Sequence, residues 1–101
     1  MYNDTDNAQQ QKAKRIIRAA LGQGLSVTVA DGEGGYSLFR ARDYAAIVDA
    51  IGEMDMDELI FSRADGSHAG WMMLVWEAGG TAEELPADYT ANDTMDTLAR
   101  A

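Results

Sequence analysis

The longest uninterrupted run of large apolar residues in this chain is Gly70–Glu77, which contains both tryptophans. Side chains alternate between the two faces of an extended strand, so the odd spacing of Trp71 and Trp76 predicts that they point in opposite directions. Both faces of such a strand are apolar, which is typical of a strand that is covered on both sides or that contacts a partner. The flanking glycines favour a strand over a buried helix, and the run is far too short to cross a bilayer.

Around this run, the pattern of apolar residues predicts three helices and three further strands. Apolar residues at helical spacing predict helices over residues 8–21, 44–54 and 94–99. Alternating or continuous apolar residues between turn signals predict strands over residues 25–30, 36–40 and 59–63. Pro86 has no backbone donor, so any strand near it is expected to be short and to lie at an edge.

The resulting order, α-β-β-α-β-β-α, predicts a single α+β domain over residues 8–101. Two hairpins joined by a helix most simply give a four-stranded antiparallel sheet with the helices packed on one face. Residues 1–7 are polar and have no periodicity, so we expect them to form a disordered tail.

The composition excludes several classes of site. The chain has no cysteine, so it can form neither disulfides nor thiolate metal sites, and it has no cysteine nucleophile. Its N-terminus lacks a basic segment followed by an apolar stretch, so no secretory signal is visible. The expected location is therefore the cytoplasm, and no membrane partner is expected.

The net charge of −9 is distributed unevenly along the chain. Residues 1–42 contain six Lys or Arg against four Asp or Glu, whereas residues 43–101 contain two against thirteen. Direct binding of nucleic acid requires clustered Lys and Arg, so this distribution disfavours it. It favours a partner with a basic protein surface, although high acidity also simply keeps a small protein soluble.

Two groups of acidic residues are the candidate partner-binding site. Attraction between these carboxylates and a basic surface would speed encounter and would weaken with salt. The first group surrounds the predicted end of the second helix, and the second lies near the C-terminus; the candidates are Asp49, Glu53, Asp55, Asp57 and Glu58, followed by Asp88, Asp93 and Asp96. Trp71 and Trp76 are the candidates for an apolar interface.

No residue pattern predicts an enzyme, a metal site or a cofactor site. His68 is the only histidine and lies in a Gly-Ser turn, where a solvent-facing role is expected rather than catalysis. Asp55 and Asp57 begin like a calcium-binding loop, but Gly66 stands where the bidentate glutamate should be. The two tryptophans lack adjacent cations and are predicted to lie on opposite faces, which argues against a base-stacking platform.

A set of short motifs resembles small acidic accessory proteins encoded by phages and mobile elements, a group that includes anti-CRISPR inhibitors. The resemblance covers about residues 25–100, and none of its motifs is a catalytic signature. The motifs are Ser26-Val-Thr-Val-Ala-Asp-Gly-Glu, Arg42-Asp43-Tyr, Asp55-Met-Asp-Glu-Leu-Ile-Phe, Gly70-Trp-Met-Met-Leu-Val-Trp and Asp88-Tyr-Thr-Ala-Asn. It implies a bacterial host cell and an origin in a mobile element.

Two functional hypotheses follow. The first is a non-enzymatic, anti-CRISPR-like inhibitor whose acidic patch binds a basic, nucleic-acid-handling surface of a bacterial defence complex and blocks DNA binding there. A CRISPR effector complex is the expected target, with the acidic patch imitating DNA. The second hypothesis is a structural or assembly protein that forms a homodimer through the apolar strand Gly70–Glu77.

Overall fold

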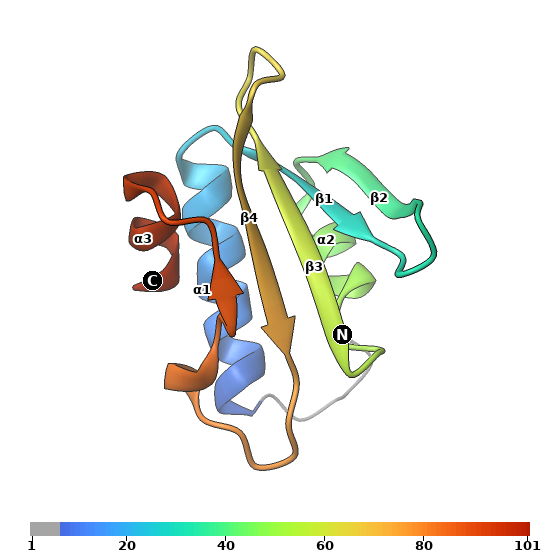
Figure 1. The fold of residues 1–101 in the computed structure, drawn as a ribbon, viewed down its shortest axis with the longest axis vertical. Coiled ribbons are helices and arrows are strands. Elements are labelled where there is room, and N and C mark those ends of the chain that lie inside the picture. The colour runs from blue at the N-terminus through green and yellow to red at the C-terminus, as the bar shows by residue number, and fades with distance from the viewer. Residues whose placement is uncertain (1–6) are drawn as a thin grey trace.

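The computed structural model describes residues 7–101, which form three α-helices and one five-stranded antiparallel sheet. The strand order is β2-β1-β3-β4-β5, so the two long hairpins lie side by side and the short β5 completes one edge (Figure 1). In chain order the elements are α1 (Ala8–Gly22), β1 (Ser26–Ala30), β2 (Tyr36–Ala41), α2 (Tyr44–Ala50), β3 (Met56–Ser62), β4 (His68–Val75), the 3-10 helix η1 (Ala82–Glu84), β5 (Asp88–Tyr89) and α3 (Asp93–Ala99).

The α+β class and the two hairpins are confirmed, but the prediction of a four-stranded sheet is wrong. The fifth strand is the two-residue β5, in which Tyr89 pairs with Met72 and Asp88 pairs with Met73 of β4. A strand of two residues has no period of its own, so its pairing is decided by tertiary contacts. The expectation of a short edge strand near Pro86 agrees with the position of β5.

Other boundaries also differ from the prediction, and β4 runs over His68–Val75 rather than Gly70–Glu77. Helix α2 ends at Ala50 rather than near Met54, because the chain leaves the helical conformation at Ile51 and Gly52 takes a positive φ of 89°. Strand β3 begins at Met56 rather than at Leu59. The predicted tail lies outside the described residues except for Asn7, which is the N-cap residue of α1 and accepts a hydrogen bond from the Gln10 backbone amide.

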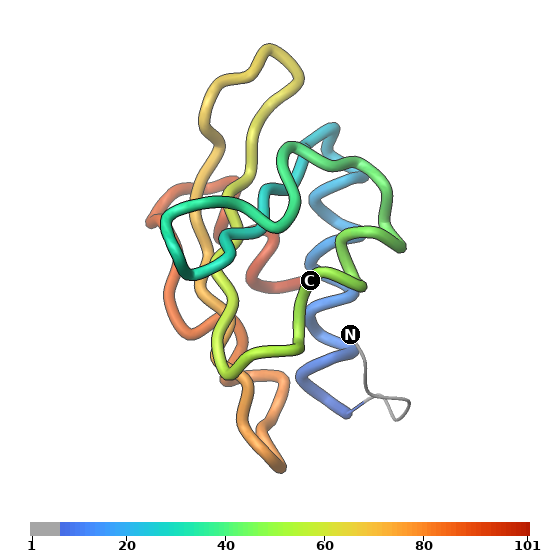
Figure 2. The backbone as a smooth tube through the Cα atoms, turned by 90° about the vertical axis from the view of Figure 1, so that its right-hand side faces the viewer, coloured from blue at the N-terminus to red at the C-terminus, as the bar shows by residue number. Residues whose placement is uncertain are grey.

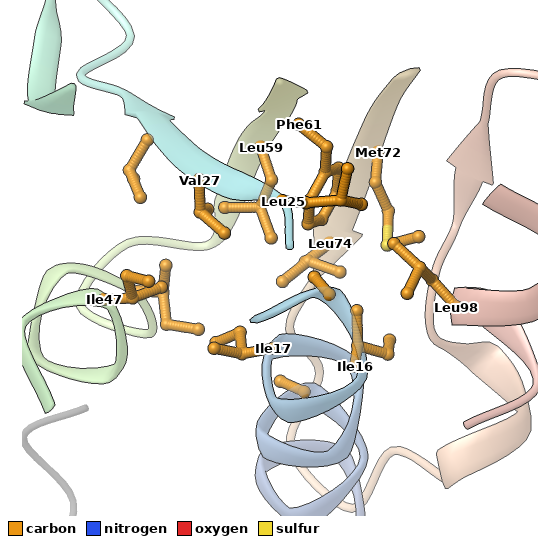
Figure 3. Packing of buried hydrophobic residues seen from close by; sticks show 14 of the residues in the cluster. Ile16, Ile17, Leu25, Val27, Ile47, Leu59, Phe61, Met72, Leu74 and Leu98 are labelled. Atoms are coloured by element: carbon orange, nitrogen blue, oxygen red, sulfur yellow. The ribbon is translucent and has the colours of Figure 1, made fainter. Parts of the chain in front are cut away.

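The helices cover one face of the sheet, which we call the inner face. In Figure 1 the strands lie in front of α1 and α2, and the view in Figure 2 shows α1 and α2 on one side of the strands. Ile16 and Ile17 of α1 point toward Leu59 and Phe61 of β3, and all four side chains are fully buried (Figure 3). Burial of each such side chain contributes about 1.5–3 kcal/mol, so this layer is the main source of stability.

Candidate interaction surface on the open sheet face

The opposite face of the sheet, which we call the open face, is not covered by any helix of the described chain (Figures 1 and 2). Strand register decides which side chains lie on it, because directly paired residues point to the same side. Ile60 of β3 pairs with Trp71 of β4, and its other neighbour is Thr28 of β1. Since the alternating residues Leu59 and Phe61 are buried against the helices, Ile60 and Trp71 belong to the open face.

The open face is rich in large apolar side chains. Met73 and Val75 continue the row of Trp71 along β4, and Met56 pairs with Val75. Among the described residues, four large hydrophobic side chains are exposed: Tyr36 (55%), Phe39 (59%), Met54 (60%) and Met56 (44%). Tyr36, Phe39 and Met56 lie on the open face, and Met54 lies in the loop just before β3. Exposed apolar side chains gathered on one uncovered face are typical of an interaction site.

A β-bulge in β2 lies beside the aromatic residues of this face. Between Leu38 and Ala41 the register with β1 shifts, and Arg40 adopts a left-handed conformation with φ of 49°. The backbone amide of Arg40 donates a hydrogen bond to the Thr28 hydroxyl at 2.9 Å. Thr28 is therefore buried, although its side chain belongs to the open face. The neighbouring Phe39 is exposed, and its ring lies 5.5 Å from that of Tyr36. Such bulges and strained residues occur often at functional surfaces.

Acidic residues surround the end of the open face where β1 ends and β3 begins. Asp31, Asp55 and Glu58, together with Met54 and Met56, line an open hollow of about 310 Å³. We call this region the acidic end. The carboxylate of Asp31 accepts hydrogen bonds from the backbone amides of its own turn, whereas Asp55 is exposed. The hollow therefore combines an apolar lining with negative charge.

Arginines surround the other end of the open face, where β1 begins and β3 ends. Arg40, Arg42 and Arg63 line an open hollow of about 580 Å³ that also includes Ser26 and Asp65. We call the three arginines and their surroundings the basic end. Arg63 donates to the His68 carbonyl oxygen at 2.6 Å, and Arg42 donates to the Leu25 carbonyl oxygen at 3.0 Å. These bonds fix the guanidinium groups in place without neutralising their charge.

The structure does not bring the eight predicted acidic residues together. Asp49 lies on α2, which packs beneath β1 and β2, whereas Asp93 and Asp96 lie on α3, which packs beneath β4. Glu53 and Asp55 are exposed in the loop before β3, and Asp88 is exposed on the edge strand β5. The predicted residues therefore occupy opposite sides of the molecule, and only Asp55 and Glu58 share a hollow.

Asp57 is turned inward. It points to the inner face beside Leu74, with which it pairs, and only 6% of its surface is exposed. Its carboxylate oxygen Oδ2 accepts hydrogen bonds from the Trp76 indole (2.7 Å) and from the Gly52 backbone amide (2.8 Å). Asp57 therefore links the loop that follows α2 to the end of β4 through these two hydrogen bonds. Because it is buried, its carboxylate is not available to a partner.

The two tryptophans lie on opposite faces, as the spacing predicts. Trp71 is on the open face and donates its indole N–H to Glu58 at 3.1 Å, whereas Trp76 donates to the inward-facing Asp57. Of the two predicted apolar interface residues, only Trp71 thus lies on the open face, and Trp76 is partly buried on the other side. The exposed His68 is the first residue of β4 rather than part of the preceding turn.

The open-face residues that the sequence analysis missed are Tyr36, Phe39, Arg40 and Arg63. Leu38 pairs with the buried Val29, so alternation places its neighbour Phe39 on the open face, whereas Arg40 reaches this face only because of the bulge. Arg63 reaches the same end from the turn after β3. The cluster of two aromatic residues and two arginines in the short segment 36–42 was the available signal.

Within residues 7–101, no group of three or more His, Asp or Glu side chains is arranged to hold a metal ion. In the same part of the chain, none of the helices has the length and apolar character needed to cross a membrane. Comparison with known proteins gives no matching family model, no matching curated protein and no matching solved structure.

Proposed function

We propose that this chain is a non-enzymatic interaction protein whose contact surface is the open face of its sheet. The observation that carries the proposal is the difference between the two sheet faces: helices bury one, and the other presents large apolar side chains to solvent. Tryptophan, tyrosine and arginine are the residue types that contribute most to protein–protein binding, and Trp71 is partly exposed on the open face. Trp71, Tyr36 and Arg40 supply all three on this surface.

Site-specific photocrosslinking tests this proposal. A benzophenone amino acid replaces Phe39 or Met73 on the open face, and in a matched control it replaces Ala45, which is exposed on α2. In bacterial cells that express the full chain, we expect covalent protein adducts from the two open-face positions and few from the control. Absence of adducts from Phe39 and Met73, or equal labelling from Ala45, would show that this face is not the contact surface.

The acidic end favours a second candidate, which retains the inhibitor hypothesis in a reduced form. Asp31, Asp55 and Glu58 surround a hollow lined by Met54 and Met56, and this combination suits the long apolar stem and charged head of a Lys or Arg side chain. In this reading the protein binds a basic surface of a defence complex through this end alone, in keeping with its resemblance to acidic phage proteins.

A plaquing assay tests the second candidate. In a bacterium with an active CRISPR system, expression of the chain should raise the plaquing efficiency of a targeted phage. The double variant D55K/E58K should remove this effect, whereas D93K/D96K, which changes the net charge equally on α3, should retain it. Asp57 is left unchanged because it is buried. A wild-type chain that leaves plaquing unchanged would count against the inhibitor function.

A further inference from the structure

The structure assigns a specific occupant to the open face: a second copy of this chain, packed face to face with its strands running in the opposite direction. The inference rests on the proposed function, since it uses the same surface. In this arrangement the acidic end of one copy lies over the basic end of the other.

The charge distribution on the face is the first reason. At one end the hollow is lined by three carboxylates, Asp31, Asp55 and Glu58. At the other end it is lined by three arginines, Arg40, Arg42 and Arg63, against the single carboxylate of Asp65, so the two ends have opposite net charge. Ile60 and Trp71, which pair with each other, lie between the two ends, and Met73 pairs with Glu58 at the acidic end. The surface is therefore complementary to itself when one copy is turned end over end.

Symmetry is the second reason. A two-fold axis that lies between two sheets and runs across the strands reverses strand direction, so every contact occurs twice. The β2 edge of one copy then lies over the β2 edge of the other, and both pairs of opposite charges form together. A two-fold axis along the strands would instead place arginines over arginines and carboxylates over carboxylates. Like charges across an interface are unfavourable, so the first arrangement is selected.

The middle of the face suits a protein sheet. Phe39 and Ile60 line a shallow hollow of about 170 Å³ with Tyr36, and side chains of a facing sheet can interdigitate there. A single-stranded nucleic acid would also stack on these rings, but it would have to cross the acidic end. Its phosphates are all negative, so, unlike a second copy of this chain, it has no cationic group to place over Asp31, Asp55 and Glu58.

Sedimentation velocity of the purified protein is the primary test. The sedimentation coefficient should rise with protein concentration from the value of a monomer to that of a dimer. Raising the salt concentration screens the attraction between opposite ends, but it also screens the repulsion between two chains of net charge −9, so the charge-reversal variants test the electrostatics instead. The variant I60R places a charge at the centre of the face and should weaken association by about tenfold or more.

Charge reversal tests the orientation. The variants R40E/R63E and D55R/E58R each give the two ends a net charge of the same sign, so each should dimerise poorly alone. An equimolar mixture of the two should form heterodimers at least as well as the wild type forms homodimers. The control D49R/E83R changes the net charge by the same amount as D55R/E58R at exposed positions on α2 and η1, and should dimerise like the wild type.

The outcomes separate this inference from the proposed function. If the protein stays monomeric at all concentrations but gives adducts from Phe39 in cells, the inferred homodimer is wrong. The open face is then supported as a surface for another protein. Monomers without adducts overturn both. A dimer that survives I60R and both charge reversals overturns the inference, since it must use another surface. Salt-sensitive binding of a labelled single-stranded oligonucleotide by the monomer overturns it as well.

Discussion

Two neighbouring carboxylates of β3 receive the two indole N–H groups of the chain, and they differ in almost every other respect. Asp57 points to the inner face, is 6% exposed, and accepts hydrogen bonds from Trp76 and from the Gly52 amide. Glu58 points to the open face, is half-buried, and accepts from Trp71. The two pairs are one residue apart on β3, and yet one belongs to the core and the other to the surface.

This difference separates the residues that hold the fold from those available to a partner. Removing a buried carboxylate costs free energy because its hydrogen-bond donors are left unsatisfied. When a half-exposed carboxylate is removed, water can accept the hydrogen bonds instead, and the cost is smaller. The period of two along a strand therefore divides residues buried in the core from residues that remain accessible to a partner. The largest consequence should be seen in the apolar residues next to these acids.

Replacing Phe61 by alanine should destabilise the protein far more than replacing its neighbour Ile60. Phe61 is fully buried against the helices, so F61A should lower the free energy of unfolding by about 3–5 kcal/mol. Ile60 is half-buried on the open face, and I60A should cost about 1 kcal/mol. Urea denaturation of dilute protein, followed by circular dichroism, measures both. Equal losses would mean that the open face is also part of the core.

The carboxylates themselves should show the same order with smaller effects. D57A leaves the Trp76 indole N–H and the Gly52 amide without their acceptor in a buried place, which should cost about 1–3 kcal/mol. E58A removes a contact that water can replace, and should cost about 0.5 kcal/mol or less. The urea midpoints of the two variants provide the comparison, and a reversal of their order would contradict the assignment of the faces.

Arg40 tests how much strain the open face carries. Its φ of 49° is unfavourable for any residue with a Cβ atom, so R40G should be more stable than R40A by about 1 kcal/mol. Both variants lose the guanidinium that lies over the Phe39 ring, so their difference reports the backbone alone. Both should also dimerise less well than the wild type. If R40A is as stable as R40G, the bulge is not strained at this residue.

Much of this division can be predicted from the sequence, because it follows from the alternation of side chains. The opposite orientation of Trp71 and Trp76 is predicted correctly for this reason. The inward orientation of Asp57 is missed because the strand is predicted to begin at Leu59; extending the same period back by two residues places Asp57 beside Leu59 and Phe61. The error lies in the strand boundary rather than in the rule.

The remaining features depend on contacts between distant segments. Strand β5 exists only because Tyr89 and Asp88 pair with β4, and the bulge at Arg40 has no local signature such as a glycine. The basic end combines Arg40 with Arg63 from another hairpin. The net charge of the sequence does not reveal such a patch, because Asp and Glu outnumber Lys and Arg in the chain as a whole.

Asp65 provides the smallest and most discriminating comparison with Asp57, because it too accepts two hydrogen bonds but is fully exposed. The Ser67 hydroxyl and backbone amide hold the pKa of the Asp65 carboxyl below its ordinary value of 3.8. A lowered pKa stabilises the folded state at pH values above the unfolded pKa, and this contribution is lost as the pH falls through the folded value. D65N should therefore be slightly less stable than the wild type at neutral pH, and the difference in unfolding free energy should shrink on acidification.

Urea midpoints of the wild type and D65N at about pH 7 and about pH 2.5 measure this effect. Solvent screens an exposed carboxylate, so we expect a shift much smaller than that of D57A despite the equal number of hydrogen bonds. If D65N is as destabilising as D57A, the number of bonds rather than burial decides the effect. In that case the distinction between the inner and open faces would not explain why Asp57 and Glu58 differ.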